Sequence, residues 1–205
     1  MILISWNYQG LGNPWAVRDL CLLMKEKRPN LLFLIEIKRT NKEMEWIRLK
    51  LGFDSLFVVD PIKRKGGLAL LWSKECSLAI QNFSLKHINA TVSSEEVGLE
   101  WKLTCFYRHL EVGKRHEGWA VLKYLKSCSP YPWLSVGDYN EIVDNSEKWG
   151  AAVRKESQME QFRGCLEECQ LSDLGFIGSK YTWTNAREDG DFTKVWLDRV
   201  LANKE

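Results

Sequence analysis

The sequence has little net charge and no long apolar run. Its 29 basic and 27 acidic side chains leave a formal net charge of +2, so overall electrostatics do not indicate a nucleic-acid-binding protein. No apolar run approaches the roughly 18 residues of a membrane span, and Met1–Ser5 lacks the regions of a signal peptide. We therefore expect no membrane partner. Contact with DNA would have to come from local basic clusters such as Lys63–Lys65 and Lys114–His116, which could equally be solvated loops.

Cysteine spacing typical of zinc sites is also absent. The six cysteines form no Cys-X-X-Cys pair and have no accompanying histidine spacing, which argues against zinc. Cys165 and Cys169 are four residues apart, so helix packing explains them. Free thiols without a secretion signal indicate a reducing compartment, and we expect an intracellular protein, nuclear or cytoplasmic, without a disulfide-linked partner.

The chain does contain the elements of one α/β domain. It has 205 residues, is 45% hydrophobic and shows no repeat or linker, so we predict a single domain over residues 1–205. Asn13-Pro14 is a strong helix start. The predicted helices are 14–27, 42–51, 116–126 and 156–169, and the predicted strands are 2–7, 31–38, 53–59, 68–72, 77–83, 88–93, 99–106, 132–136, 181–185 and 194–201.

Polar side chains follow three of these strands. Asn7, Glu36, and the pair Asp138 and Asn140 each come at a strand end. Such ends converge on one edge of an α/β sheet, and an oxygen-rich cluster there suits Mg²⁺. Gly137 would let the backbone turn before Asp138, although Gly-Asp-X-Asn is also ordinary turn chemistry.

Short motifs also occur in a recognisable order. They are Trp6–Asn7 with Gly10–Gly12, then Leu34–Lys38, Gly66–Trp72, Phe106–Tyr107, Gly137–Ile142 and Leu197–Arg199. Together they resemble the exonuclease–endonuclease–phosphatase superfamily over almost the whole chain. Ser172–Phe176, Tyr181–Asn185 and Leu197–Asn203 resemble, more narrowly, the endonuclease domain of plant LINE-type (non-LTR) retrotransposons.

The resemblance implies a fold and a reaction. The fold would be a four-layer α/β sandwich, in which two packed mixed sheets are flanked by helices. The reaction would be Mg²⁺-dependent hydrolysis of DNA phosphodiester bonds, with Mn²⁺ as a substitute, in a longer parent protein that carries a reverse transcriptase domain. Two alternatives stay open: a phosphomonoesterase of the same fold, and an inactive fragment that binds nucleic acid weakly.

Site residues follow from the same resemblance. Glu36 would be the principal Mg²⁺ ligand, with Asn7 and Asp138 near it. Asp138 would orient or deprotonate the attacking water, and Asn140 would hold that water or a phosphate oxygen. Tyr107 would donate its hydroxyl to the phosphate, unless it belongs to the core.

Three further residues have implied roles. Asp198 would orient the superfamily's catalytic histidine, or merely pair with Arg199 or another neighbour. Lys38 could contact the DNA backbone, and Trp183 could line the DNA groove; plain exposure or packing would explain these two equally well. Asp173 is expected to be structural.

Some positions depart from the superfamily pattern. No Ser-Asp-His occurs in the chain, and its histidines are His87, His109 and His116. We therefore expect a C-terminally truncated sandwich that lacks its last strand and nicks DNA poorly or not at all, because losing charge stabilisation on the phosphate typically costs about 10²–10³ in rate. Gln9, Ile37, Arg108 and Trp196 replace the usual Asp, Thr, Gly and Arg.

Overall fold

The computed structural model describes residues 1–7, 14–63, 65–94, 98–108, 115–128, 130–150, 152–185 and 192–204. They divide into two compact units, Met1–Phe106 and Tyr107–Glu205. The helix start at Asn13, Gln9, Gly10–Gly12, Arg64, His109 and Lys114 lie outside the described residues. No described helix combines the length and apolarity that crossing a membrane requires, and all six cysteines are free.

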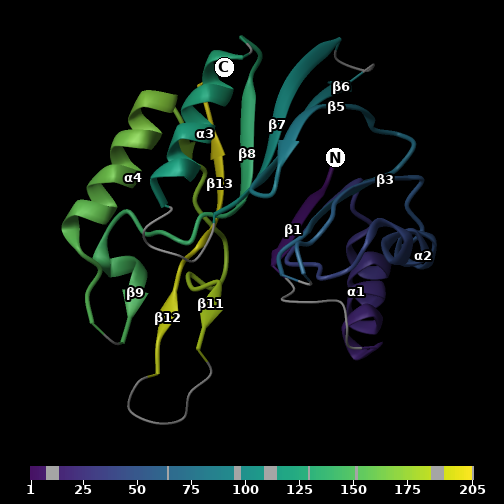
Figure 1. Cartoon of the computed structure of the whole chain (residues 1–205), viewed down its shortest axis with the longest axis horizontal. Helices are drawn as coiled ribbons and strands as arrows, with labels where there is room; N and C mark the ends of the chain where they lie inside the picture. Colours follow the sequence, from purple (N-terminus) through teal and green to yellow (C-terminus); the bar gives the residue numbers. More distant parts are fainter. Residues whose placement is uncertain are drawn as a thin grey trace. The chain divides into compact units, whose positions relative to one another are not determined.

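The first unit contains a four-stranded sheet (Figure 1). Its order is β1 (Leu3–Asn7), β2 (Leu31–Ile35), β4 (Leu68–Trp72) and β3 (Ser55–Val59). β1 and β2 are parallel, while β4 is antiparallel to both of its neighbours. All five β2 residues are buried, as expected for an uninterrupted apolar run covered on both faces.

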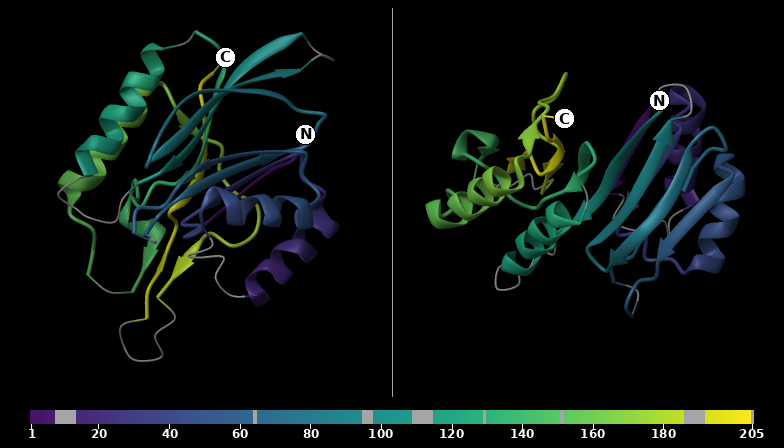
Figure 2. Two further views of the ribbon diagram at one scale, coloured as in Figure 1. Left: turned by 45° about the vertical axis from the view of Figure 1, so that its right-hand side comes forward. Right: turned by 90° about the horizontal axis from the view of Figure 1, so that it is seen from above.

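Helices α1 (Pro14–Lys27) and α2 (Asn41–Leu51) cover one face of this sheet (Figure 2). Side chains two apart on a strand point to the same face, and Leu32 and Leu34 of β2 pack in one core cluster with Leu20 of α1 and Met44 of α2. α2 begins with a capping box between Thr40 and Glu43 and ends at Gly52, which has a left-handed φ of 80°. The predicted helix 42–51 is therefore found, with one more residue at its start.

Three antiparallel strands complete the first unit. They are β5 (Ser77–Ser84), β6 (His87–Ser94) and β7 (Leu99–Tyr107), whose last residue begins the second unit. The predicted strands 77–83, 88–93 and 99–106 are therefore found, each longer by one or two residues. Its interior includes a buried hydrogen bond in which Thr104 Oγ1 donates to Asn89 Oδ1 at 2.9 Å.

In the second unit, β13 (Asp198–Ala202) pairs antiparallel with both β8 (Trp133–Asp138) and β10 (Ser172–Asp173). Helices α3 (Arg115–Ser127) and α4 (Glu156–Cys169) lie side by side. Trp119 and Phe162 stack between them with ring centroids 4.8 Å apart. Cys165 and Cys169 are buried on α4, as the packing interpretation predicted.

A small sheet shows where two strand predictions were wrong. β12 (Lys194–Val195) lies between β9 (Lys148–Trp149) and β11 (Trp183–Thr184). The segment 181–185 therefore contributes only two paired residues, and 194–201 is two strands. They separate because Trp196 N–H donates to the Glu147 carbonyl, in the 3-10 turn η2 (Asn145–Glu147), instead of continuing a ladder.

Candidate active site

Two of the predicted site residues share one sheet edge in the first unit. Asn7 is the last residue of β1 and pairs in register with Ile35, the last residue of β2. Glu36 follows directly. Because β1 and β2 are parallel, the Asn7 amide and the Glu36 carboxylate come at neighbouring strand ends, as predicted.

The segment after β2 is a strained turn rather than more strand. The predicted strand 31–38 ends at Ile35, because Glu36 and Lys38 adopt left-handed φ angles of 55° and 52°. Ile37 N–H then donates to the Gly67 carbonyl at 3.2 Å, and Lys38 N–H to the Gly66 carbonyl at 3.1 Å. Left-handed non-glycine residues cost about 1–3 kcal/mol each and cluster at functional sites.

At this turn, Glu36 forms an ion pair with Lys38. Lys38 Nζ lies 3.8 Å from Glu36 Oε2, and the side chains are 41% and 16% exposed. Lys38 is thus partly exposed to solvent beside a more buried Glu36. A partly exposed pair of this kind contributes little to stability, on the order of 0–1 kcal/mol.

In the second unit, Asp138 and Asn140 form a second polar group. Asp138 ends β8, so the strand runs one residue past Gly137 and the expected turn at the glycine comes later, at Asn140, whose φ is 48°. Asn140 N–H donates to Asp138 Oδ1 at 2.9 Å. The Asn140 side chain donates through Nδ2 to the Arg108 carbonyl at 2.7 Å. Both side chains are therefore held by hydrogen bonds, and both are about 95% buried.

Asp198 lies directly opposite Asp138 in the β8–β13 ladder. Residues opposed in this way project from the same face of a sheet. Burial and the nearby charge of Asp138 raise the pKa of Asp198 to about 7, against a hydrogen bond with Thr182 that lowers it. Two carboxylates that share a site in this manner cannot both ionise easily.

Sequence reasoning gave no role to Thr182 or to Trp196. Thr182 Oγ1 accepts from Leu197 N–H at 3.0 Å and from Asp198 N–H at 3.1 Å. Trp196 Nε1 donates to the Asp198 carbonyl at 2.7 Å. The two residues therefore fix the start of β13. Thr182 lies within the motif-like Tyr181–Asn185 segment, which was the available signal.

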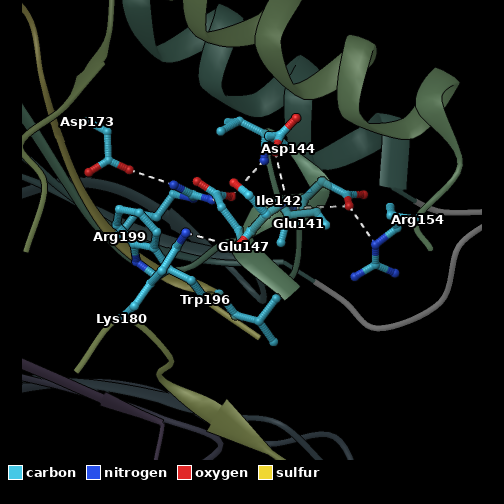
Figure 3. Close-up of polar contacts among 12 residues, drawn as sticks. Glu141, Ile142, Asp144, Glu147, Arg154, Asp173, Lys180, Trp196 and Arg199 are labelled. Carbon is cyan, nitrogen blue, oxygen red and sulfur yellow. Dashed lines mark hydrogen bonds and ion pairs between the residues drawn. The ribbon is translucent and has the colours of Figure 1, made fainter. Parts of the chain in front are cut away.

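Buried ion pairs stabilise the region where η2 meets the start of β13, called here the η2–β13 corner (Figure 3). Arg199 does not pair with Asp198; it donates to Glu147, and through Nη1 to Asp173 Oδ2 at 2.7 Å. Glu147 also accepts from Val143 N–H at 2.9 Å. Asp173 therefore has the structural role expected of it.

The two remaining aromatic candidates differ in exposure. Tyr107, at the end of β7, is 7% exposed, and Trp183, on β11, is 37% exposed. Their positions leave the phosphate-binding and groove-lining roles as predictions.

The oxygen donors fit a hard cation that keeps much of its water. Within the part of the chain that the structure describes, no group of three or more His, Cys, Asp or Glu is arranged to hold a metal ion. Mg²⁺ is commonly held by one or two carboxylates together with water and substrate phosphate. Burial, and after it the nearby charge of Asp138, raise the pKa of Asp198, and a cation bound beside these carboxylates would offset both effects.

Comparison with known proteins gives matches among solved structures alone: no family model matches the sequence, and no curated protein does. The endonuclease domain of TRAS1, a telomere-specific non-LTR retrotransposon, matches 98% of this chain over 84% of its own, with a TM-score of 0.72 and 14% identity. AP endonuclease LMAP from Leishmania major matches 98% of this chain over 78% of its own length, with a TM-score of 0.74 and 14% identity. The 3′-5′ exonuclease NExo from Neisseria meningitidis matches 99% of this chain over 87% of its own length, with a TM-score of 0.74 and 17% identity.

At such low sequence identity, the similarity to these structures shows the fold alone. The matches run over nearly the whole chain, and the chain has the mixed sheets and helices that the sequence predicted. The predicted fold class is confirmed: this chain has the α/β sandwich fold of the endonuclease, exonuclease and phosphatase enzymes.

Proposed function

We propose that this chain hydrolyses phosphodiester bonds of DNA with a divalent cation, Mg²⁺ or Mn²⁺. One observation carries the proposal: Asp138 and Asp198 oppose each other at strand ends, and Asn140 is hydrogen-bonded beside them. The fold likeness to nucleic-acid-cutting enzymes supports the same reaction class.

Each of four residues has its own role in the proposed reaction. Asp138 takes a proton from the attacking water; its Oδ1 is already oriented by Asn140 N–H, so the carboxylate is set in advance. Asn140 holds the water or a phosphate oxygen, and Tyr107 donates its hydroxyl to the phosphate. Asp198 is the partner carboxylate that sets the charge around Asp138.

The cation and the DNA contact other residues of the proposed site. Glu36 and Asn7 would hold the cation with Asp138, and when bound it would neutralise charge on the phosphate and the leaving oxygen. Lys38 and Trp183 would contact the DNA backbone and bases. We assign all eight residues by chemistry and by resemblance.

The test is conversion of supercoiled plasmid to open circle, with chain in excess over DNA so that slow cutting is measurable. We expect cutting with Mg²⁺ and none with EDTA. Asp138→Asn should lower the rate by about 10²-fold or more, because the base and its charge are lost. Asp19→Asn, which makes the same change on the exposed side of α1, should cut as the wild type does.

The same preparations separate the alternatives. Release of phosphate from a 3′-phosphorylated oligonucleotide without plasmid nicking would favour the phosphomonoesterase. Retention of DNA on a gel without either reaction would favour the inactive binding fragment, and would contradict the proposal.

We further propose that the DNA reaction serves a retroelement of the LINE type, in the nucleus or cytoplasm, beside a reverse transcriptase domain of a longer parent protein. The support is the motif order and the likeness to the TRAS1 domain. Such cutting must leave 3′-hydroxyl ends that a polymerase can extend. Nicked plasmid that no polymerase extends would contradict this assignment.

A further inference from the structure

Arg108 is an unexpected residue beside the Asp138–Asn140 group. It follows β7, and its side chain is among the largest that are fully buried. Its backbone N–H donates to the Asp138 carbonyl at 3.0 Å, and its carbonyl accepts from Asn140 Nδ2 at 2.7 Å. Any residue except proline at this position could supply these two bonds, because both use backbone atoms of residue 108.

The guanidinium adds contacts that depend on arginine. It lies over the Trp119 ring, 4.1 Å from the centroid, where a cation is attracted to the π face. Its Nη1 donates to the Tyr139 carbonyl at 3.3 Å and to Glu141 Oε2 at 3.4 Å. Arg108 therefore contacts every residue of the 138–141 segment.

A buried guanidinium is costly unless its charge is balanced. Glu141 balances it: this side chain is 0% exposed and is shared with Arg154, whose Nε lies 2.9 Å from Glu141 Oε1. The Arg154 side chain is 22% exposed, whereas that of Arg108 is buried. The glycine expected here from the superfamily pattern would make none of the contacts of the guanidinium.

We propose that Arg108 is a positioning residue, whose guanidinium, held by the Trp119 ring, the Tyr139 carbonyl and Glu141, keeps Asp138 and Asn140 in their working conformation. Asn140 is left-handed, with φ 48°, and such a residue persists where its surroundings impose it. This inference rests on the proposed function, because Asp138 and Asn140 are assigned there.

The first test compares two arginines that share Glu141. Arg108→Met should lower kcat for Mg²⁺-dependent cutting by about 10–100-fold, the range typical of residues that orient catalytic groups, with KM within about twofold. Arg154→Met, the matched control, should keep kcat. Equal kcat in the wild type and Arg108→Met would overturn the inference.

A second variant separates positioning from stability. Arg108→Met leaves Glu141 less well balanced, so the double variant Arg108→Met/Glu141→Gln should recover the urea midpoint and fold even where the single variant does not. Its kcat should stay low, because the contact with the Tyr139 carbonyl is still missing. Recovery of kcat together with the midpoint would reduce Arg108 to a structural role and overturn the inference.

The third readout needs no catalysis. Hydrogen exchange of the Asn140 side-chain amide, followed by NMR, should be slow in the wild type and in Arg154→Met, and about tenfold faster or more in the double variant. If the wild type cuts no DNA, the proposed function fails, and this exchange rate still decides the inference. Unchanged exchange in the double variant would overturn it.

Discussion

At the scale of single residues, hydrogen bonds at both ring nitrogens keep His87 in its neutral form. Nε2 lies 2.9 Å from Asn82 Oδ1, which can only accept, so Nε2 carries the proton. Nδ1 lies 2.8 Å from Ser84 Oγ, whose hydroxyl donates to it. Burial lowers the pKa of His87 from 6.5 to about 4.

This environment predicts a pH dependence of stability. Between pH 6.5 and 4 the unfolded chain binds a proton at His87 that the folded chain does not, so the free energy of unfolding falls as the pH falls through that window. We expect the free energy of unfolding, measured with urea, to fall between pH 7 and pH 4.5. The fall should be about 1–2 kcal/mol larger in the wild type than in His87→Gln. An equal loss in both would show that His87 is not the titrating group.

Gly67 is a second residue with a specific requirement. Its φ is 87°, and a Cβ there would lie 2.8 Å from Ile37 Cγ1, in the turn that carries Glu36. Gly66 has a φ of 73° and nothing within 4 Å of such a Cβ.

The neighbouring glycine therefore provides a matched control. Gly66→Ala should cost about 1 kcal/mol, from the left-handed backbone alone. Gly67→Ala should cost about 2–3 kcal/mol, because the contact with Ile37 is added. Urea denaturation measures both, and equal costs would mean that the Ile37 contact relaxes freely.

At the scale of elements, the corner between η2 and β13 depends on a buried pair. Arg199 and Glu147 are paired with side chains 1% and 7% exposed. Glu147→Gln should cost about 3–5 kcal/mol, since it leaves a buried charge less well compensated. Glu168→Gln removes the partner of Lys123 in a pair that is 41% and 58% exposed, and should cost far less, because water screens an exposed pair. Similar costs in the two variants, measured by thermal unfolding, would contradict this account of the corner.

At the scale of the whole molecule, the sequence predicts most element bounds correctly. The helix 156–169 and the strand 68–72 are found as predicted, because apolar periodicity is a local signal. The break between β12 and β13 was not predictable in this way. It depends on partners such as Glu147 and Thr182, which are remote in sequence.

The candidate site shows the same division. Asn7, Glu36, Asp138 and Asn140 were predictable because strand ends carry polar groups. The left-handed turn at Glu36 depends on the carbonyls of Gly66 and Gly67, and the contacts of Arg108 depend on Trp119 and Glu141. Neither follows from local pattern.

The central claim is that these strand-end carboxylates make the chain a cation-dependent phosphodiesterase. The most direct measurement is the single-turnover cutting rate of one labelled duplex as a function of Mg²⁺ concentration. We predict that Glu36→Gln raises the half-maximal Mg²⁺ concentration by about tenfold or more, since a carboxylate ligand is lost, and that Asp138→Asn lowers the maximal rate by about 10²-fold. Glu75→Gln, an exposed control, should follow the wild-type curve. Wild-type curves for both site variants would contradict the account.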